Sequence, residues 1–264
     1  MFLAALIPGV LAALGYITAI AIYVRFFTTS GPNKKKVDFS TRFSLFRDIW
    51  HVLLIFFIVI GGIYLGWFTP TEGAAVGAAG TGLIAVFNKN FSLDNFFEVI
   101  NDTAVTTAMI FLVLLGAEFF NSFIALSRVT NILSETILGY NYSPFTIVAI
   151  ILLIYIFLGC LMDSLAMILL TIPVFFPVII QLDFGMSYEE TAIWFGILTL
   201  IVVEVGLITP PVGLNAFIIN KIAGDIPIKE TFKGVLPFLI SDFLRVILLF
   251  AFPGITLFLV RLLY

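Results

Sequence analysis

The sequence predicts an all-α polytopic membrane protein, and two observations carry this prediction: the composition and the length of the apolar runs. Hydrophobic residues make up 61% of the 264 residues and charged residues 11%, whereas a soluble domain is about half apolar and a quarter charged. A soluble fold with thirty phenylalanines and so few charged side chains could not cover its surface. We therefore expect most of the surface to face lipid, with helices as the spanning elements.

Charge and cysteine content exclude several function classes. The net charge is −3 and the basic residues form no broad face, so we expect no nucleic-acid partner. The single cysteine, Cys160, allows neither an intramolecular disulfide nor a thiolate metal cluster within the chain. Cys160 and the lone histidine, His51, form no convincing pair of nucleophile and base. We therefore do not expect an enzyme.

The first apolar run, residues 2–24, predicts a retained membrane helix. It lacks a basic leader, exceeds the apolar core of a signal peptide and ends in charges without a small-residue cleavage site. The segment that follows, residues 25–48, carries six Lys and Arg residues against two Asp residues. By the positive-inside rule this loop is cytoplasmic.

Further spans and interfacial helices follow from hydropathy and periodicity. Crossing the hydrocarbon core takes about 20 helical residues, and the further candidates are residues 49–66, 73–87, 103–123 and 236–259. The second of these is short and rich in Gly and Ala, which predicts close packing inside a bundle. Residues 91–102 and 126–137 alternate apolar and charged side chains at helical spacing, so we expect both to lie along the membrane interface.

The apolar run over residues 143–180 is too long for one crossing at about 1.5 Å per residue. It is interrupted by Gly159, Asp163 and Ser164. Two full crossings joined by a tight turn at Asp163 would account for it. A re-entrant hairpin whose polar tip lines a protein-enclosed cavity would account for it equally well.

A second interruption predicts a broken helix. A membrane helix must end at Thr209, because the adjacent Pro210 and Pro211 remove two backbone donors and exclude helical geometry before them. A break inside the bilayer frees carbonyl oxygens that neighbouring protein, trapped water or a cation has to satisfy. Hard cations prefer such oxygens. We therefore interpret the segment up to Gly213, with Asn215 after it, as a cation site rather than a plain kink.

The predicted spans include the charged residues Glu204, Asp242 and Arg245. Glu204, just before the break, must be paired, hydrated or protonated, because an unpaired carboxylate is costly there. We expect it to form a hydrogen bond with a neighbouring helix. Asp242 and Arg245 are three residues apart on the last helix and can neutralise each other.

Three motifs in order resemble the large membrane subunit of tripartite ATP-independent periplasmic (TRAP) transporters, of the dicarboxylate and sialic acid type. They are GWFTPTEGAAVG at residues 66–77, DSLAMILLTIP at 163–173 and GLITPPVGLN at 206–215. The resemblance runs along nearly the whole chain, with a few extra residues around 183–190. It implies an ion-transporter-superfamily-like fold in which a re-entrant helical hairpin, about 143–181, lies beside a broken transmembrane helix, about 190–221.

The resemblance also implies a function: sodium-coupled import of small organic anions, such as C4-dicarboxylates or sialic acid, by an elevator mechanism in the bacterial inner membrane. Na⁺ would be the coupling ion, with no other cofactor. A small TRAP membrane subunit and a periplasmic substrate-binding protein would be the partners. Residues 1–141 would supply mainly scaffold-like transmembrane and interfacial helices, residues 142–232 transport-domain elements and residues 233–264 the final transmembrane helix.

Carried over by position, the resemblance implies a sodium site made mainly of backbone oxygens from Gly159, Gly206, Thr209 and Val212. The wider set of expected sodium-binding and substrate-binding residues comprises Gly159, Asp163, Ser164, Gly206, Thr209, Pro210, Pro211, Val212, Gly213 and Asn215.

The family's large subunit has two inverted halves, each with one hairpin and one broken helix, and the motifs here match its C-terminal half. A midplane site between repeats needs both halves, so this sequence supplies one side of it. We expect a fragment, a split-gene product or a truncated reading frame, with the N-terminal half of the large subunit as a further partner. The alternatives are a non-transporting membrane scaffold, or half of another ion-coupled transporter.

Overall fold

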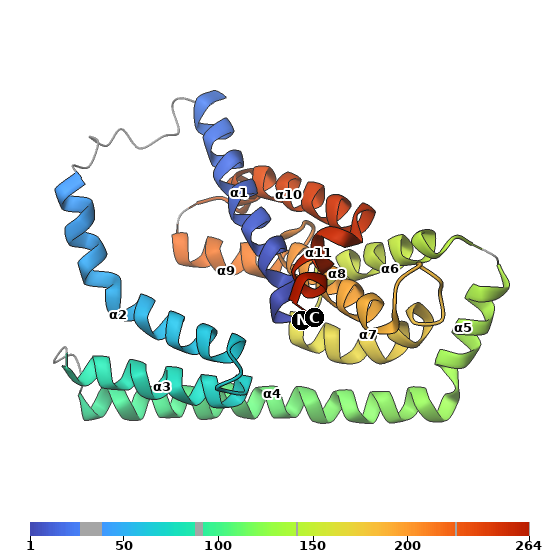
Figure 1. Cartoon of the computed structure of the whole chain (residues 1–264), viewed down its shortest axis with the longest axis horizontal. Helices are drawn as coiled ribbons and strands as arrows, with labels where there is room; N and C mark the ends of the chain where they lie inside the picture. The colour runs from blue at the N-terminus through green and yellow to red at the C-terminus, as the bar shows by residue number, and fades with distance from the viewer. Residues whose placement is uncertain (27–38, 88–91, 141, 225, 264) are drawn as a thin grey trace. The chain divides into compact units, whose positions relative to one another are not determined.

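Eleven helices and no strand make up the described part of the chain (Figure 1). The computed structural model describes residues 1–26, 39–87, 92–140, 142–224 and 226–263, with the backbone alone for residues 39–48 and 138. The helices are α1 (Phe2–Phe26), α2 (Phe39–Tyr64), α3 (Pro70–Phe87), α4 (Leu93–Ser127), α5 (Val129–Gly139), α6 (Pro144–Gly159), α7 (Ser164–Ile179), α8 (Tyr188–Ile208), α9 (Leu214–Ala223), α10 (Ile228–Ala251) and α11 (Pro253–Leu263). Helices α1, α4, α8 and α10 are long and apolar enough to cross a membrane. The prediction of an all-α polytopic membrane protein is confirmed.

Two compact units divide the chain: Met1–Gly31 with Ile110–Tyr264, and Pro32–Met109. In the smaller unit α3 packs against α2. Three glycines of α3, Gly73, Gly77 and Gly80, form a stripe at helical spacing. Cβ atoms added to them would lie 3.0–3.5 Å from side-chain atoms of Ile63, Val59 and Ile55. The small residues thus allow the close approach that the sequence predicts.

Thr69 and Glu72 form a reciprocal cap at the start of α3. The Thr69 N–H and hydroxyl donate to Glu72 Oε2 at 2.8 and 2.9 Å, and the Glu72 N–H donates to Thr69 Oγ1 at 3.3 Å. Pro70 takes the first helical position, where an N–H would have no helical partner. The backbone hydrogen bond from Thr69, and then the hydroxyl one, lower the pKa of Glu72 below its ordinary value. The TPTE stretch of the first motif is therefore a helix-start signal.

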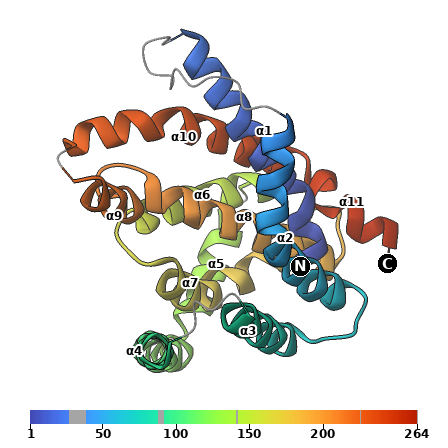
Figure 2. The same ribbon diagram turned by 90° about the vertical axis from the view of Figure 1, so that its left-hand side faces the viewer.

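Helix α8 is the centre of the larger unit. It packs against α1, α6, α7, α9, α10 and α11. In its most apolar stretch 61% of the residues are buried, against 6% in α1. Trp194 is fully buried, and its indole N–H donates to the Leu249 carbonyl at 3.0 Å, which ties α8 to α10. Figure 2 shows α10 above α8 and α9, and it packs against both. Helix α8 thus faces protein on most of its surface, and it brings its neighbours to the break at its end.

The predicted boundary between an interfacial helix and a membrane span at residues 102 and 103 is wrong. The sequence predicts an interfacial helix at 91–102 and a span at 103–123, but α4 is one helix of 35 residues. No Gly or Pro stands between the two segments, so nothing ends the first of them. Phe91 lies outside the described residues, as do residues 27–38 of the expected cytoplasmic loop.

The second predicted interfacial segment, residues 126–137, is not one helix, because its first two residues end α4. Its residues 129–137 lie in helix α5. Helix α5 begins after Arg128, whose φ of 56° ends the helical path of α4. This backbone region is unfavourable for a residue with a Cβ. The boundary between α4 and α5 is therefore a local kink of the chain rather than a long loop.

The span expected at residues 236–259 is not one helix. Helix α10 ends at Ala251, and α11 begins at Pro253. Phe252 between them has non-helical backbone angles, with φ −127° and ψ 75°. The residue before a proline avoids helical geometry, so the Phe-Pro pair could have predicted this break. Arg261 on α11 forms an ion pair with Glu190 at the start of α8, at 2.6 Å. The turn at Phe252 thus folds α11 back against the central helix.

Candidate functional site

The hairpin predicted over residues 143–181 is two helices, α6 and α7, joined by a short tip. Ser143 caps α6 by accepting the Thr146 N–H at 3.2 Å. The Thr171 hydroxyl donates to the Tyr155 hydroxyl at 2.9 Å, which links the two arms. The apolar run therefore turns back on itself at the polar interruption.

The predicted helix break is present between α8 and α9. Thr209 has extended geometry, with φ −86° and ψ 133°, as the prolines after it require. Pro210 and Pro211 are exposed and joined by a cis peptide bond. Gly213 precedes α9 with φ +60°, in the left-handed region that favours glycine. The segment 209–213 therefore owes its shape to its own residue types.

The hairpin tip and the helix break are in backbone contact. A Cβ added to Gly206 would lie 2.7 Å from Gly159 Cα and 3.1 Å from the Ile156 carbonyl oxygen. A Cβ added to Gly159 would lie 3.0 Å from Gly206 Cα and 3.1 Å from the Val203 carbonyl oxygen. These neighbours are backbone atoms that cannot rotate away. Only glycine at both positions allows α6 and α8 to approach so closely.

The carbonyl oxygens at this contact differ in their hydrogen bonds. The Gly206 oxygen accepts from the Thr209 N–H at 3.0 Å, and the Val205 oxygen accepts from the Thr209 hydroxyl at 2.6 Å. The carbonyl oxygens of Gly159, Thr209 and Val212 accept no hydrogen bond from the described part of the chain. Free carbonyl oxygens in a membrane interior need another partner. Three of the four predicted sodium ligands thus have a free oxygen, and Gly206 keeps its second lone pair.

Four helix ends lie around the contact. Helices α6 and α8 end there, and α7 and α9 begin a few residues further on. The Cys160 thiol lies 3.7 Å from the Pro210 carbonyl oxygen, which is a second link between tip and break. The carboxyl ends of α6 and α8 carry partial negative charge and the amino ends of α7 and α9 partial positive charge. The Gly159–Gly206 contact joins two negative ends, which favours a cation.

Other residues of the predicted site have local roles. Asp163 is exposed and caps α7, because its carboxylate accepts the N–H groups of Leu165 and Ala166 at 3.0 and 3.4 Å. Ser164 and Asn215 are half-buried in the first turns of α7 and α9. Within the described ranges, no hydrogen bond joins Asp163, Ser164 or Asn215 across the contact.

Sequence reasoning missed Cys160 and misjudged Glu204. Cys160 is 3% exposed and touches the break; its place next to Gly159 is the one signal that could have found it. Glu204 is exposed although the residues on either side of it are buried. The predicted hydrogen bond from Glu204 to a neighbouring helix is not found among the described residues. The carboxylate therefore faces away from the core of this unit.

The prediction that Asp242 and Arg245 neutralise each other is confirmed. Arg245 Nη2 lies 2.8 Å from Asp242 Oδ1, and the Tyr16 hydroxyl donates to Asp242 Oδ2 at 2.8 Å. The cluster ties α1 to α10. Nowhere in the described ranges do three His, Cys, Asp or Glu side chains come together to hold a metal ion. An ion at the contact of hairpin and break would therefore depend on backbone and hydroxyl oxygens.

Comparison with known proteins gives a consistent similarity. The sequence model of the family described as "Tripartite ATP-independent periplasmic transporter, DctM component" matches residues 1–255. The sialic acid TRAP transporter permease protein SiaT of Haemophilus influenzae is 31% identical over 265 residues, 100% of this chain and 41% of that protein. The sialic acid TRAP transporter large permease protein SiaM of Vibrio cholerae is 30% identical over 97% of this chain and 58% of its own length.

A third relative is the C4-dicarboxylate TRAP transporter large permease protein DctM of Pseudomonas aeruginosa. It is 29% identical over 258 residues, which are 97% of this chain and 58% of that protein. The chain thus spans about half the length of the curated relatives that it matches. Each matched segment includes both the hairpin and the broken helix.

Proposed function

Because the chain belongs to the family of DctM components of tripartite ATP-independent periplasmic transporters, we propose that it forms one side of a sodium site in an importer of small organic anions. Relatives named for sialic acid and for C4-dicarboxylates make these anions the first candidates. Both kinds of substrate carry carboxylates. The amino ends of α7 and α9 are suited to receive such a group.

The observation that carries this proposal is the contact between Gly159 and Gly206. It holds the carboxyl ends of two helices together in an apolar unit, where their negative ends oppose each other. Three carbonyl oxygens of the hairpin tip and the helix break have no hydrogen bond from the described residues. A monovalent cation between tip and break would satisfy these oxygens and balance the two helix ends.

Ion and substrate would be coupled through this geometry. Sodium would hold the hairpin tip against the break and so set the spacing between the starts of α7 and α9. An anion that binds there would then bind better to the sodium-loaded state. In this proposal the hairpin is re-entrant, and the packed α6–α9 elements move as one body in an elevator mechanism. The division of the chain into scaffold and transport elements stays a prediction.

The proposed transporter includes more than this chain. The relatives are longer than this chain. In this proposal a further part of the large subunit supplies the opposite side of the site. A small membrane subunit, a periplasmic substrate-binding protein and a bacterial inner membrane location are part of the same proposal. The exposed Glu204 carboxylate would face that further protein, because it cannot face lipid unpaired.

The test is a sodium-dependent shift in thermal stability of the purified chain. Unfolding of the chain in detergent is followed by tryptophan fluorescence in NaCl or in choline chloride at the same ionic strength. Sodium at ten times its Kd should stabilise the folded state by about 1.4 kcal/mol, a rise of a few degrees in Tm. Thr209→Val removes the hydroxyl that donates to the Val205 carbonyl oxygen at the break. This variant should lose most of the sodium-dependent rise in Tm.

Thr199→Val is the matched control. Thr199 lies on the same helix, is buried, and its hydroxyl has no partner in the described ranges. This variant should keep the sodium response of the unchanged protein. A chain that is folded by circular dichroism but equally stable in both salts would refute the sodium site.

A further inference from the structure

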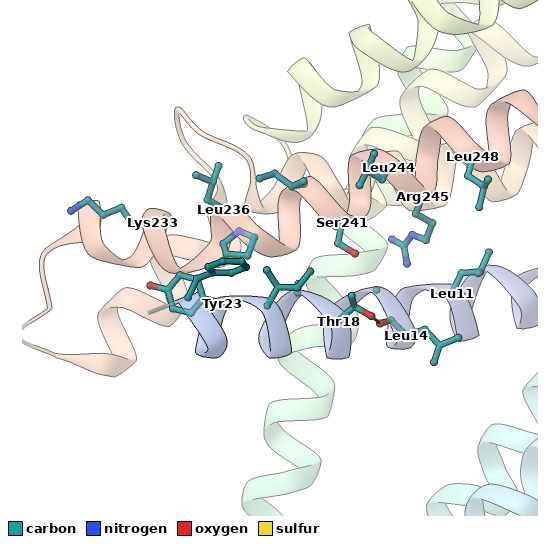
Figure 3. A pocket seen from close by; sticks show the side chains of 16 residues that line it. Leu11, Leu14, Thr18, Tyr23, Lys233, Leu236, Ser241, Leu244, Arg245 and Leu248 are labelled. Atoms are coloured by element: carbon teal, nitrogen blue, oxygen red, sulfur yellow. Dashed lines mark hydrogen bonds between the residues drawn. The ribbon is translucent and has the colours of Figure 1, made fainter. Parts of the chain in front are cut away.

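A long groove lies between α1 and α10 in the larger unit (Figure 3). Its volume is about 1170 Å³ and its lining is almost entirely apolar. Leu14, Ile22, Ile240 and Leu244 line it and are each more than half exposed. The two helices approach each other closely at Gly15, where an added Cβ would collide with Ser241 Oγ.

The groove covers one part of the helices. On α1 it runs from Leu11 to Phe26, which is about 22 Å at 1.5 Å per residue. In the amino-terminal part of α1, Ala4 and Pro8 are buried, and Ala4 belongs to the hydrophobic core of the unit. One leaflet with its headgroups is about 20–22 Å thick. The groove therefore has the depth of a single leaflet.

We expect the open end of the groove to lie at the cytoplasmic surface. Helix α1 leads from this end into the basic segment 25–48, which the positive-inside rule places in the cytoplasm. Lys233 and Tyr23 line this end (Figure 3). Arg25 and Lys229 are their neighbours in sequence. Tyrosine and lysine are typical of the headgroup level of a membrane.

The two ends of the groove differ in charge. At the deep end Arg245 is neutralised by Asp242 at 2.8 Å, so an apolar chain meets no net charge there. At the open end Lys233 pairs with Glu230 at 2.6 Å, but both side chains are more than half exposed, and such pairs are weak in water. With Arg25 and Lys229 nearby, basic residues exceed acidic ones among the described residues of this end.

We propose that this groove binds one anionic phospholipid of the cytoplasmic leaflet. The phosphate lies at Lys233 and Tyr23, and the acyl chains lie along α1 and α10 towards Leu11 and Leu248. A membrane-crossing helix does not fit the same space, because the groove closes where α1 meets the rest of the unit. A lipid of the opposite leaflet would have its headgroup at the closed, apolar end.

The first test is lipid binding to the purified chain by native mass spectrometry. The chain in detergent is titrated with dioleoyl phosphatidylglycerol or with dioleoyl phosphatidylcholine, which has the same acyl chains and no net charge. We expect one phosphatidylglycerol molecule to bind more tightly than phosphatidylcholine. Lys233→Gln should weaken phosphatidylglycerol binding about fivefold, the effect of one basic residue near an anionic surface. It should weaken phosphatidylcholine binding less, because the choline ammonium group offsets the charge of the phosphate.

Lys221→Gln is the matched control, because Lys221 lies on α9 and does not line the groove. It should leave both affinities unchanged. Equal binding of the two lipids, or equal losses from Lys233→Gln and Lys221→Gln, would overturn the proposal.

A second pair of variants tests the acyl-chain part of the groove. Ala19→Phe fills the groove and should abolish retention of the single lipid. Because a large side chain could disturb the packing of α1 on α10, Leu244→Gln serves as a milder change at a side chain that is 62% exposed. Leu244→Gln should weaken the binding of phosphatidylglycerol and phosphatidylcholine to the same extent. Unchanged binding in both variants would show that lipid does not occupy the groove. Crosslinking of Leu244→Cys to protein in native membranes would show the same.

Discussion

Helices α6 and α8 meet backbone to backbone, whereas α3 meets the side chains of α2. At the first contact, Cβ atoms added to Gly159 or Gly206 would fall 2.7–3.1 Å from backbone atoms. At the second, Cβ atoms added to Gly77 or Gly80 would fall 3.4–3.5 Å from side-chain methyl and methylene groups of Val59 and Ile55. Both contacts use glycines on apolar helices, but only the first has no atom that can move aside.

This difference separates a site from a packing surface. A cation site made of carbonyl oxygens needs those oxygens at fixed positions, and the rigid contact of α6 with α8 supplies them. The stripe on α3 needs only a close fit. Four changes to the two regions test this comparison, in order of decreasing expected effect.

Gly206→Ala should be the most harmful. The added methyl group would overlap Gly159 Cα and force α6 away from α8, at a cost of about 1–3 kcal/mol in the free energy of unfolding. The sodium-dependent rise in Tm should be lost as well. Denaturant titration in mixed micelles measures the first effect and the salt comparison the second. Gly116→Ala is the control, since a Cβ at Gly116 meets open space; equal stability of the two variants would contradict the rigid contact.

Asp163→Ala should cost about 1 kcal/mol, because it removes the side chain that caps α7. Asp163→Asn should cost much less, since asparagine caps helices as well as aspartate does. Both variants should keep the sodium response. A variant Asp163→Asn with normal stability and no sodium response would instead make the carboxylate a ligand of the ion.

Gly77→Ala should change the free energy of unfolding in the opposite direction to Gly206→Ala. The new methyl group would make an ordinary contact with Val59 Cγ2 at 3.5 Å, and alanine in a helix interior is favoured over glycine by about 0.5–1 kcal/mol. We expect a small increase in the free energy of unfolding, measured by the same denaturant titration. A loss comparable with that of Gly206→Ala would remove the distinction between the two contacts.

Glu72→Gln should have the smallest effect, confined to the start of α3. The hydrogen bonds from Thr69 lower the pKa of Glu72 below 4.5 in the folded state, so their contribution is complete above pH 4.5 and is lost as the pH falls through the lowered pKa. The protection factor of the first amides of α3, which corrects the exchange rate for the intrinsic effect of pH, should therefore fall at acidic pH in the unchanged protein. In Glu72→Gln this pH dependence should be absent, with Glu98→Gln on α4 as a control that retains it.

Local chemistry was the predictable part of this molecule. The break at Thr209 follows from two adjacent prolines and the turn at Asp163 from a polar interruption, and both positions are those of the structure. The misplaced boundaries have local causes too. No helix-ending residue stands near residues 102 and 103, so α4 continues through them. Pro253 begins a new helix although the apolar pattern runs on without interruption. Hydropathy identifies lipid-compatible segments and is a weak guide to where one helix stops.

By itself, the sequence determined the membrane class, through its composition and its long apolar runs. It also determined the helix break and the hairpin turn, because these two depend on neighbours within about one turn. Only the tertiary structure decided that Gly159 meets Gly206, that α8 is enclosed while α1 is largely exposed, and that α1 and α10 leave a groove between them. These features join residues far apart along the chain, and an apolar pattern does not specify which face of a helix meets which partner. The free carbonyl oxygens at the broken helix are thus predictable from its prolines, whereas the surface that they meet is not.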